Sequence, residues 1–155
     1  MKILITGSTG QLGKTLIKDF KNISNKNQLK IYTPSRKEFN LSSKSDKLES
    51  FIDKLNPDWV INCAAYTEVD KAEEEQELAY QINTIGPKTI SKALERNKGK
   101  MIQISTDYVF SGGKGSPYKP YDKLDPISIY GKTKAEGEDY VISKLKERSH
   151  IIRVS

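Results

Sequence analysis

Short apolar runs alternate along the chain with longer segments in which apolar residues recur at helical spacing. The apolar runs have the length and content of buried strands: they are Lys2–Thr6, Leu29–Tyr32, Trp59–Cys63, Met101–Ser105 and His150–Val154. Helical periodicity covers residues 10–22, 44–55, 74–97 and 129–145, with a bend or break expected in the third segment at Gly86-Pro87. Strands that alternate with helices predict βαβ units. We therefore expect an α/β fold, a doubly wound parallel sheet of five strands with helices on both faces.

Composition narrows the class of protein further. A chain of 155 residues has the length of one domain, and no apolar run approaches the roughly 18 residues of a membrane helix. A single cysteine, Cys63, and a single histidine, His150, exclude an internal disulfide and a Cys/His metal cluster, so we expect no metal site and a cytoplasmic location. The net charge of +6 comes from scattered lysines, which is typical of a solvated surface, and nucleic-acid binding is not expected.

A glycine-rich turn follows the first predicted strand. Gly7, Gly10 and Gly13 have the spacing G-x-x-G-x-x-G, with Gln11 and Leu12 before the last glycine, and an amphipathic helix follows. Glycines let the backbone approach a pyrophosphate, and the helix N-terminus offers unpaired N–H groups to that anion. A structural turn is the alternative, but a strand before the turn and a helix after it are the context that a dinucleotide site requires. The pattern predicts a Rossmann-like dinucleotide-binding site.

The residues after the second predicted strand bear on the choice of cofactor. The acidic residue that grips an adenosine 2′-hydroxyl in many such folds is absent after Tyr32. Ser35, Arg36 and Lys37 instead offer a hydroxyl and two cations, which suit a 2′-phosphate. NADPH is therefore the expected cofactor, with NADH as the alternative. An ordinary exposed Lys/Arg pair is the other interpretation of these residues.

A second motif lies at the start of the last predicted helix. Tyr130 and Lys134 are four residues apart and share one helical face, so that the ammonium can lower the pKa of the phenol toward neutrality. Such a tyrosine can donate a proton to a carbonyl oxygen as hydride reaches the carbon. Thr106 follows the fourth predicted strand, at the sheet edge where ligands bind, and its hydroxyl can polarise the same carbonyl. A Tyr/Lys pair alone is common, but the three features together favour a ketoreductase.

At these residues the sequence resembles the dTDP-4-dehydrorhamnose reductase family of extended short-chain dehydrogenases/reductases. The resemblance covers nearly the whole chain and is carried by residues 7–13, 62–73, 105–110 and 130–138. It implies a cofactor site and a catalytic triad. The cofactor residues would be Gly7, Gly10, Gln11, Leu12 and Gly13 at the pyrophosphate, Ser35 and Arg36 at the adenosine ribose, Asn40 and Leu41 at the adenine, Ala64, Ala65 and Tyr66 along the middle, and Tyr130 and Lys134 at the nicotinamide end. The catalytic residues would be Thr106, Tyr130 and Lys134, with Thr106 and Asp107 touching the sugar.

The resemblance also implies a reaction, the NAD(P)H-dependent reduction of dTDP-4-dehydro-L-rhamnose to dTDP-L-rhamnose. Two alternatives stay open: a non-catalytic dinucleotide-binding regulatory subunit of the same fold, and a reductase or epimerase for a different nucleotide sugar. The hydroxyls of Ser105 and Thr106 favour an enzyme. Expected partners are a dTDP-linked sugar nucleotide and a second copy of the chain in a homodimer, and no membrane.

Family members continue for roughly as many residues again. We therefore expect residues 1–155 to form an NAD(P)-binding Rossmann domain without the substrate-binding C-terminal domain, and to be inactive alone.

Overall fold

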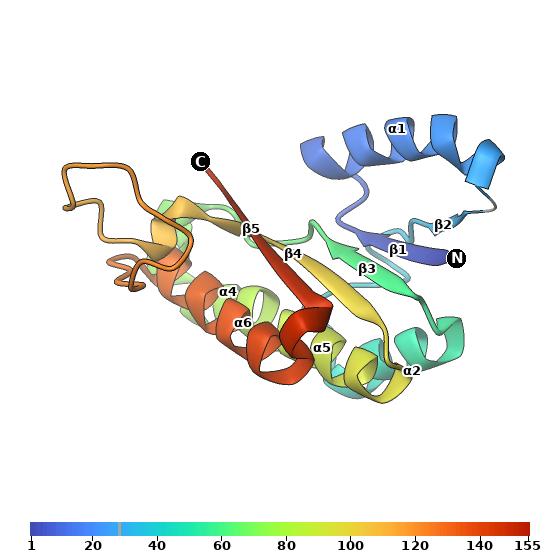
Figure 1. Ribbon diagram of the computed structural model, residues 1–155. Coiled ribbons are helices and arrows are strands. Elements are labelled where there is room, and N and C mark those ends of the chain that lie inside the picture. Colours follow the sequence, from blue (N-terminus) through green and yellow to red (C-terminus); the bar gives the residue numbers. More distant parts are fainter. Residues whose placement is uncertain (28) are drawn as a thin grey trace.

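The computed structural model describes residues 1–27 and 29–155 and contains a five-stranded sheet with helices on both faces (Figure 1). Every neighbouring pair of strands is parallel, and the strand order is β2-β1-β3-β4-β5. This confirms the predicted doubly wound sheet, and each strand end lies within one residue of its predicted position. The strands are β1 (Lys2–Thr6), β2 (Lys30–Tyr32), β3 (Trp59–Asn62), β4 (Lys100–Thr106) and β5 (Ser149–Val154).

Helices fill the connections between the strands, and one loop, residues 110–128, extends beyond the sheet next to the start of α6 (Figure 1). None of the helices in the described part of the chain is long and apolar enough to cross a membrane. The α-helices are α1 (Gln11–Asn27), α2 (Ser45–Leu55), α3 (Val69–Glu74), α4 (Gln76–Tyr80), α5 (Gly86–Asn97) and α6 (Ile129–Leu145), joined by a π-helical turn η1 (Gln81–Ile85) and the 3₁₀ turns η2 (Asp107–Val109) and η3 (Lys146–Arg148).

The third helical segment differs from its prediction. Helix begins earlier, at Val69, and the interruption lies at Glu75, where the backbone leaves the helical region (φ −99°, ψ 44°). At Gly86 the backbone stays helical (φ −55°, ψ −60°), so the break expected there is wrong. Pro87 has no N–H to donate to the carbonyl of Asn83, four residues earlier. The chain accommodates the proline with the wider π turn of η1 just before it and continues into α5.

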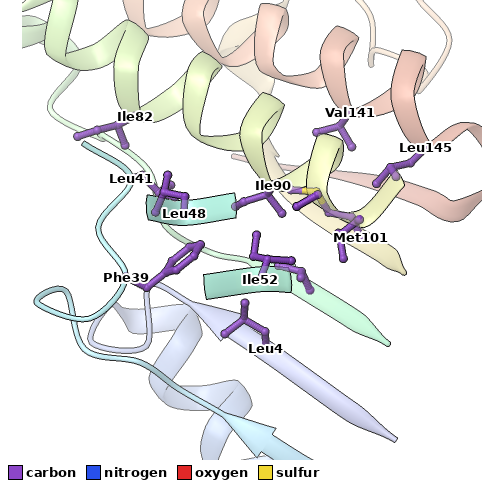
Figure 2. Close-up of a cluster of buried hydrophobic side chains, with 13 residues drawn as sticks. Leu4, Phe39, Leu41, Leu48, Ile52, Ile82, Ile90, Met101, Val141 and Leu145 are labelled. Carbon is purple, nitrogen blue, oxygen red and sulfur yellow. The ribbon is translucent and has the colours of Figure 1, made fainter. Parts of the chain in front are cut away.

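Around β1 and β3 the sheet is buried on both faces. Successive side chains of each strand point to opposite sides and enter two different apolar clusters. Leu4, Val60 and Met101 are fully buried and face the layer of α2, α5 and α6. Figure 2 shows several members of this cluster meeting between the sheet and the helices. Burial of each such side chain contributes about 1.5–3 kcal/mol. This core fixes the strands whose carboxyl ends carry the candidate site.

The opposite face is covered over only part of its width. Ile3, Ile5 and Ile61 pack there against α1. Beyond them, Ile152 and Val154 on β5 keep 45% and 48% of their surface exposed. Figure 1 shows α1 alone on this face, beside β1 and β2.

Candidate active site

A pocket of about 630 Å³ opens beside the carboxyl ends of β1 and β3. The chain leaves β1 toward β2 on one side and returns to β3 on the other, and ligands of open α/β sheets bind at such a switch point. Three segments, one after each of β1, β2 and β3, form most of the lining, and Leu78 of α4 and Ile82 of η1 complete it. Most of the predicted cofactor residues are on its walls: Gly7, Gly10, Gln11, Leu12, Gly13, Arg36, Asn40, Leu41, Ala64, Ala65 and Tyr66.

Close backbone contacts shape the glycine-rich turn. Gly7 has φ +64°, and a Cβ there would lie 2.7 Å from the backbone nitrogen of Ala64 on the opposite wall. A Cβ on Gly13 would lie 2.3 Å from the carbonyl oxygen of Gly7, so the first turn of α1 packs directly on the loop. The first turn of α1 holds no acidic residue, which leaves its positive dipole end free for an anion. The shape and charge of the turn fit a pyrophosphate.

Beyond β2, only one of the two residues predicted at the adenosine ribose faces the pocket. Arg36 lines it, is exposed and forms no ion pair with any residue that the structure describes. Ser35 turns away, because its backbone N–H and its hydroxyl both donate to the carboxylate of Glu38 at 2.8 Å. These bonds lower the pKa of Glu38. The spacing Ser-x-x-Glu is that of a capping box and could have indicated this pairing from the sequence.

Tyr130 and Lys134 lie on the first turns of α6 and are both buried, at 8% and 4% exposure. Ser128 caps the helix by accepting a hydrogen bond from the N–H of Gly131 at 3.1 Å. The helix starts against the segment that follows β4, because a Cβ on Gly131 would lie 2.2 Å from the carbonyl oxygen of Tyr108. The structure therefore brings the predicted Tyr/Lys pair to the carboxyl end of β4.

Thr106 ends β4, and its hydroxyl lowers the pKa of the Tyr130 phenol. Its hydroxyl also donates to Asp107 and accepts from the N–H of Tyr108, both at 3.2 Å. The ring of Tyr108 meets the ring of Tyr130 edge-on at 5.6 Å. Thr106 and Tyr130 thus meet at the end of β4, and Lys134, one turn further along α6, donates to the carbonyl of Ile104 on the same strand.

A second hollow of about 360 Å³ adjoins this group. Asp107 and Tyr108 form one wall, and the loop of residues 110–128 forms the other. Within that loop Phe110 and Tyr118 stack with ring centroids 4.3 Å apart. Apolar rings with a carboxylate and hydroxyls beside them suit a polar ring-shaped ligand such as a sugar.

The pKa of Tyr130 differs from the sequence prediction. Burial raises it, Asp107 and Tyr108 raise it further, and the hydrogen bond from Thr106 opposes them. The predicted lowering by Lys134 is not found. The Nζ atom of Lys134 donates instead to the backbone carbonyl of Ile104 at 2.6 Å. Burial lowers the pKa of Lys134 to about 8, against the attraction of Glu138.

Stability should respond to this buried lysine. In the unfolded chain Lys134 titrates near 10.5 and in the folded chain near 8, so the unfolded state binds more protons between these pH values. The free energy of unfolding should therefore rise with pH across that interval, by about 3 kcal/mol relative to Lys134→Met. Urea unfolding of both proteins from pH 7 to 10.5 checks this, since other titrating groups cancel in the difference. A difference that stays constant would contradict the burial of the ammonium.

A protein-family model described as "RmlD substrate binding domain" matches residues 1–155. The chain belongs to this family. Relatives of the RmlD family agree: the chain is 38% identical over 154 residues to a dTDP-4-dehydrorhamnose reductase of Aggregatibacter actinomycetemcomitans, covering 99% of this chain and 51% of the relative. It is also 38% identical over 154 residues to the spore coat polysaccharide biosynthesis protein SpsK of Bacillus subtilis, covering 99% of this chain and 52% of that protein. The chain spans about half the length of the curated relatives that it matches.

Solved structures of RmlD-family relatives have the same fold. A crystal structure of a dTDP-4-dehydrorhamnose reductase from Clostridium acetobutylicum superposes with a TM-score of 0.92 at 40% identity, covering 100% of this chain and 53% of that chain. The reductase from Bacillus anthracis, solved in complex with NADP, gives a TM-score of 0.89 at 35% identity, covering 98% of this chain and 52% of that chain. A UDP-glucose 4-epimerase from Thermus thermophilus, at 18% identity and a TM-score of 0.81, shares the fold.

Sequence reasoning missed Asn83, which joins the pocket wall to the catalytic helix. Its side-chain amide accepts from the N–H of Tyr66 at 2.9 Å and donates to the carbonyl of Tyr66 at 3.0 Å. The same amide nitrogen lies 3.3 Å from the hydroxyl of Thr133, next to Lys134. The available signal in this RmlD-family chain was an asparagine at helical spacing from Ala79 and Gly86, on the face of the helical stretch that turns inward.

Two further residues line or adjoin the site in this RmlD-family chain. Cys63 directly follows β3 and lines the first pocket. Burial raises the pKa of its thiol to about 11, so the thiol is protonated at neutral pH and serves in packing. Ser105, beside Thr106, is buried, and its hydroxyl has no hydrogen-bond partner among the described residues.

Proposed function

We propose that this chain supplies the cofactor-binding and catalytic residues of an NADPH-dependent reductase that converts dTDP-4-dehydro-L-rhamnose to dTDP-L-rhamnose. The observation that carries the proposal is the meeting of two features at one edge of the sheet. The pocket behind the glycine-rich turn lies beside β1 and β3, and Thr106, Tyr130 and Lys134 lie at the end of β4, the next strand. The names of the RmlD-family relatives supply the substrate.

The proposed roles follow from what each side chain can donate. NADPH, when bound, supplies the hydride that reaches the C4 carbonyl carbon. Tyr130 gives its phenolic proton to the carbonyl oxygen, which becomes the C4 hydroxyl, and Thr106 donates a hydrogen bond to the same oxygen. Lys134 holds ribose hydroxyls of the cofactor, and the phenolate left on Tyr130 regains its proton from water. Asp107 accepts hydrogen bonds from the sugar.

The cofactor assignment uses the walls of the first pocket. The loop from Gly7 to Gly13 holds the pyrophosphate, Arg36 pairs with the 2′-phosphate, and Asn40 and Leu41 flank the adenine. We assign residues 1–155 to one NAD(P)-binding domain. The cytoplasmic location and the homodimer stay predictions.

Separate titrations of the chain with NADPH and NADH test this assignment. We expect tighter binding of NADPH, by about tenfold or more, because a guanidinium–phosphate hydrogen bond contributes about 1.5–3 kcal/mol. Arg36→Gln should remove the preference and leave NADH binding unchanged. Lys37→Gln is the matched control, since Lys37 is exposed but is not on the pocket wall. Isothermal titration calorimetry gives all the affinities.

The outcomes separate the parts of the proposal. Equal affinities for the two cofactors in the unaltered chain would remove Arg36 from the proposal and keep the pyrophosphate site. Binding of neither cofactor to a folded chain would contradict the dinucleotide site itself.

A further inference from the structure

Three buried polar side chains form a hydrogen-bonded row across β1, β3 and β4. Thr6 is paired with Asn62 and Asn62 with Gln103 in the register of the sheet, and none of them is more than 2% exposed. The hydroxyl of Thr6 donates to Oδ1 of Asn62, and Nδ2 of Asn62 donates to Oε1 of Gln103 at 2.8 Å. Two residues earlier on each strand, the same face of the sheet carries the apolar row Leu4, Val60 and Met101.

The row connects the nucleotide pocket with the catalytic lysine. At one end, Thr6 directly precedes Gly7, and its hydroxyl accepts from the N–H of Ala64, a pocket wall residue, at 3.3 Å. At the other end, Nε2 of Gln103 donates to the carbonyl of Ile104 at 2.8 Å. That carbonyl also accepts from Nζ of Lys134 at 2.6 Å. Hydrogen bonds therefore run without interruption from Ala64 and Thr6, beside the glycine-rich turn, to the ammonium.

Packing alone does not account for polar residues at these positions. Apolar side chains fill the preceding row at full burial, whereas a buried amide costs free energy unless its hydrogen bonds are made. Each amide in the row is oriented by its neighbours on both sides, so that a displacement at one member leaves the next without its partner. In a low-dielectric interior the hydrogen bonds of such a network strengthen one another.

We propose that Thr6, Asn62 and Gln103 are positioning residues that couple occupation of the glycine-rich turn by a diphosphate to the placement of the Lys134 ammonium. The inference rests on the proposed dinucleotide site. A diphosphate at the turn tightens the backbone at Gly7 and Ala64, and the Thr6 hydroxyl follows. The amides of Asn62 and Gln103 transmit the change to the Ile104 carbonyl that holds Lys134.

ADP is the probe that isolates this coupling, because it carries the diphosphate but no second ribose that could touch Lys134. The chain is labelled with ¹³C and ¹⁵N at lysine, and the Lys134 side-chain signal is assigned as the one lost in Lys134→Arg. We expect saturating ADP to shift this signal in the unaltered chain. Gln103→Met and Thr6→Val should each reduce the shift by at least half, while Thr6→Ser, which keeps the hydroxyl, should retain it.

The variants separate coupling through the row from the direct field of the phosphates, because that field is the same in all of them. A shift of full size in Gln103→Met and Thr6→Val overturns the proposal, and so does an unmoved signal in the unaltered chain with ADP bound. If ADP does not bind, the proposed dinucleotide site is contradicted, and the coupling that depends on it is contradicted as well. Thr6→Val keeps the shape of the side chain and carries the test if Gln103→Met does not fold.

Discussion

Replacement of Tyr130 with phenylalanine should lower the rate of carbonyl reduction by about 10²- to 10⁴-fold, the usual contribution of a positioned proton donor. Phenylalanine keeps the ring that packs edge-on against Tyr108 and removes only the hydroxyl. The affinity for NADPH and the fold should therefore change little. The rate is measured as oxidation of NADPH with dTDP-4-dehydro-L-rhamnose, in whatever length of the protein turns over this substrate.

Tyr140→Phe is the matched control for that experiment. Tyr140 lies on the same helix, outside both pockets, where its ring packs under the ammonium of Lys88 at 4.2 Å. The same chemical change there should leave the rate unaltered. Full activity of Tyr130→Phe would show that Tyr130 is not the proton donor. If no form of the protein reduced the substrate while NADPH still bound, the result would favour a regulatory dinucleotide-binding subunit.

Gly13→Ala should weaken NADPH binding by about 100-fold or more, which corresponds to about 2.7 kcal/mol. The new Cβ would lie 2.3 Å from the carbonyl oxygen of Gly7 and 3.0 Å from the Cα of Ser8. Both are backbone atoms of the turn, so the turn must move away from the position in which it cradles the diphosphate. The displacement should also lower the free energy of unfolding by about 1–3 kcal/mol.

Calorimetric titration and urea unfolding of the same samples check both effects of Gly13→Ala. Gly113→Ala is the control, because a Cβ there would find its nearest neighbour, the hydroxyl of Ser111, at 4.0 Å. It should change neither quantity. NADPH binding at full strength by the Gly13 variant would show that the turn does not hold the cofactor.

The sequence predicted the sheet well because each strand is a short, largely apolar run, as is typical of parallel sheets, and β1 and β3 are the most completely buried. The last helix was predicted with its observed bounds, since Ser128 caps its start and the periodicity ends at Leu145. The helical region from Val69 to Asn97 was predicted less well. Its apolar residues recur at nearly continuous helical spacing. Neither the interruption at Glu75 nor the π turn changes that spacing enough to be detected in the sequence.

The walls of the nucleotide pocket could be predicted because they follow strand ends, which converge at one edge of a parallel sheet. Side-chain directions could not. Ser35 turns to Glu38, and Lys134 donates to Ile104. Burial raises the pKa of Tyr130, which is opposite to the direction that the pairing of Tyr130 and Lys134 predicted. The row of Thr6, Asn62 and Gln103 could not be predicted from the sequence either, because it depends on the register of three strands that are far apart in sequence.

Three helical glycines bring main chain against main chain around the site: Gly13 of α1 on the turn, Gly131 of α6 on the Tyr108 segment, and Gly137 of α6 on the Asn83 carbonyl, which its Cβ would approach to 2.2 Å. Spacing set by backbone atoms does not depend on which side chains cover the two helices. The surfaces of α1 and α6 can therefore diverge widely during evolution without moving the catalytic group relative to the cofactor pocket. The loop after β4 has the opposite character, since a Cβ on Gly112 or Gly115 would have no described atom within 4 Å. We expect natural variants to differ in substrate preference through this loop while the three glycines stay invariant.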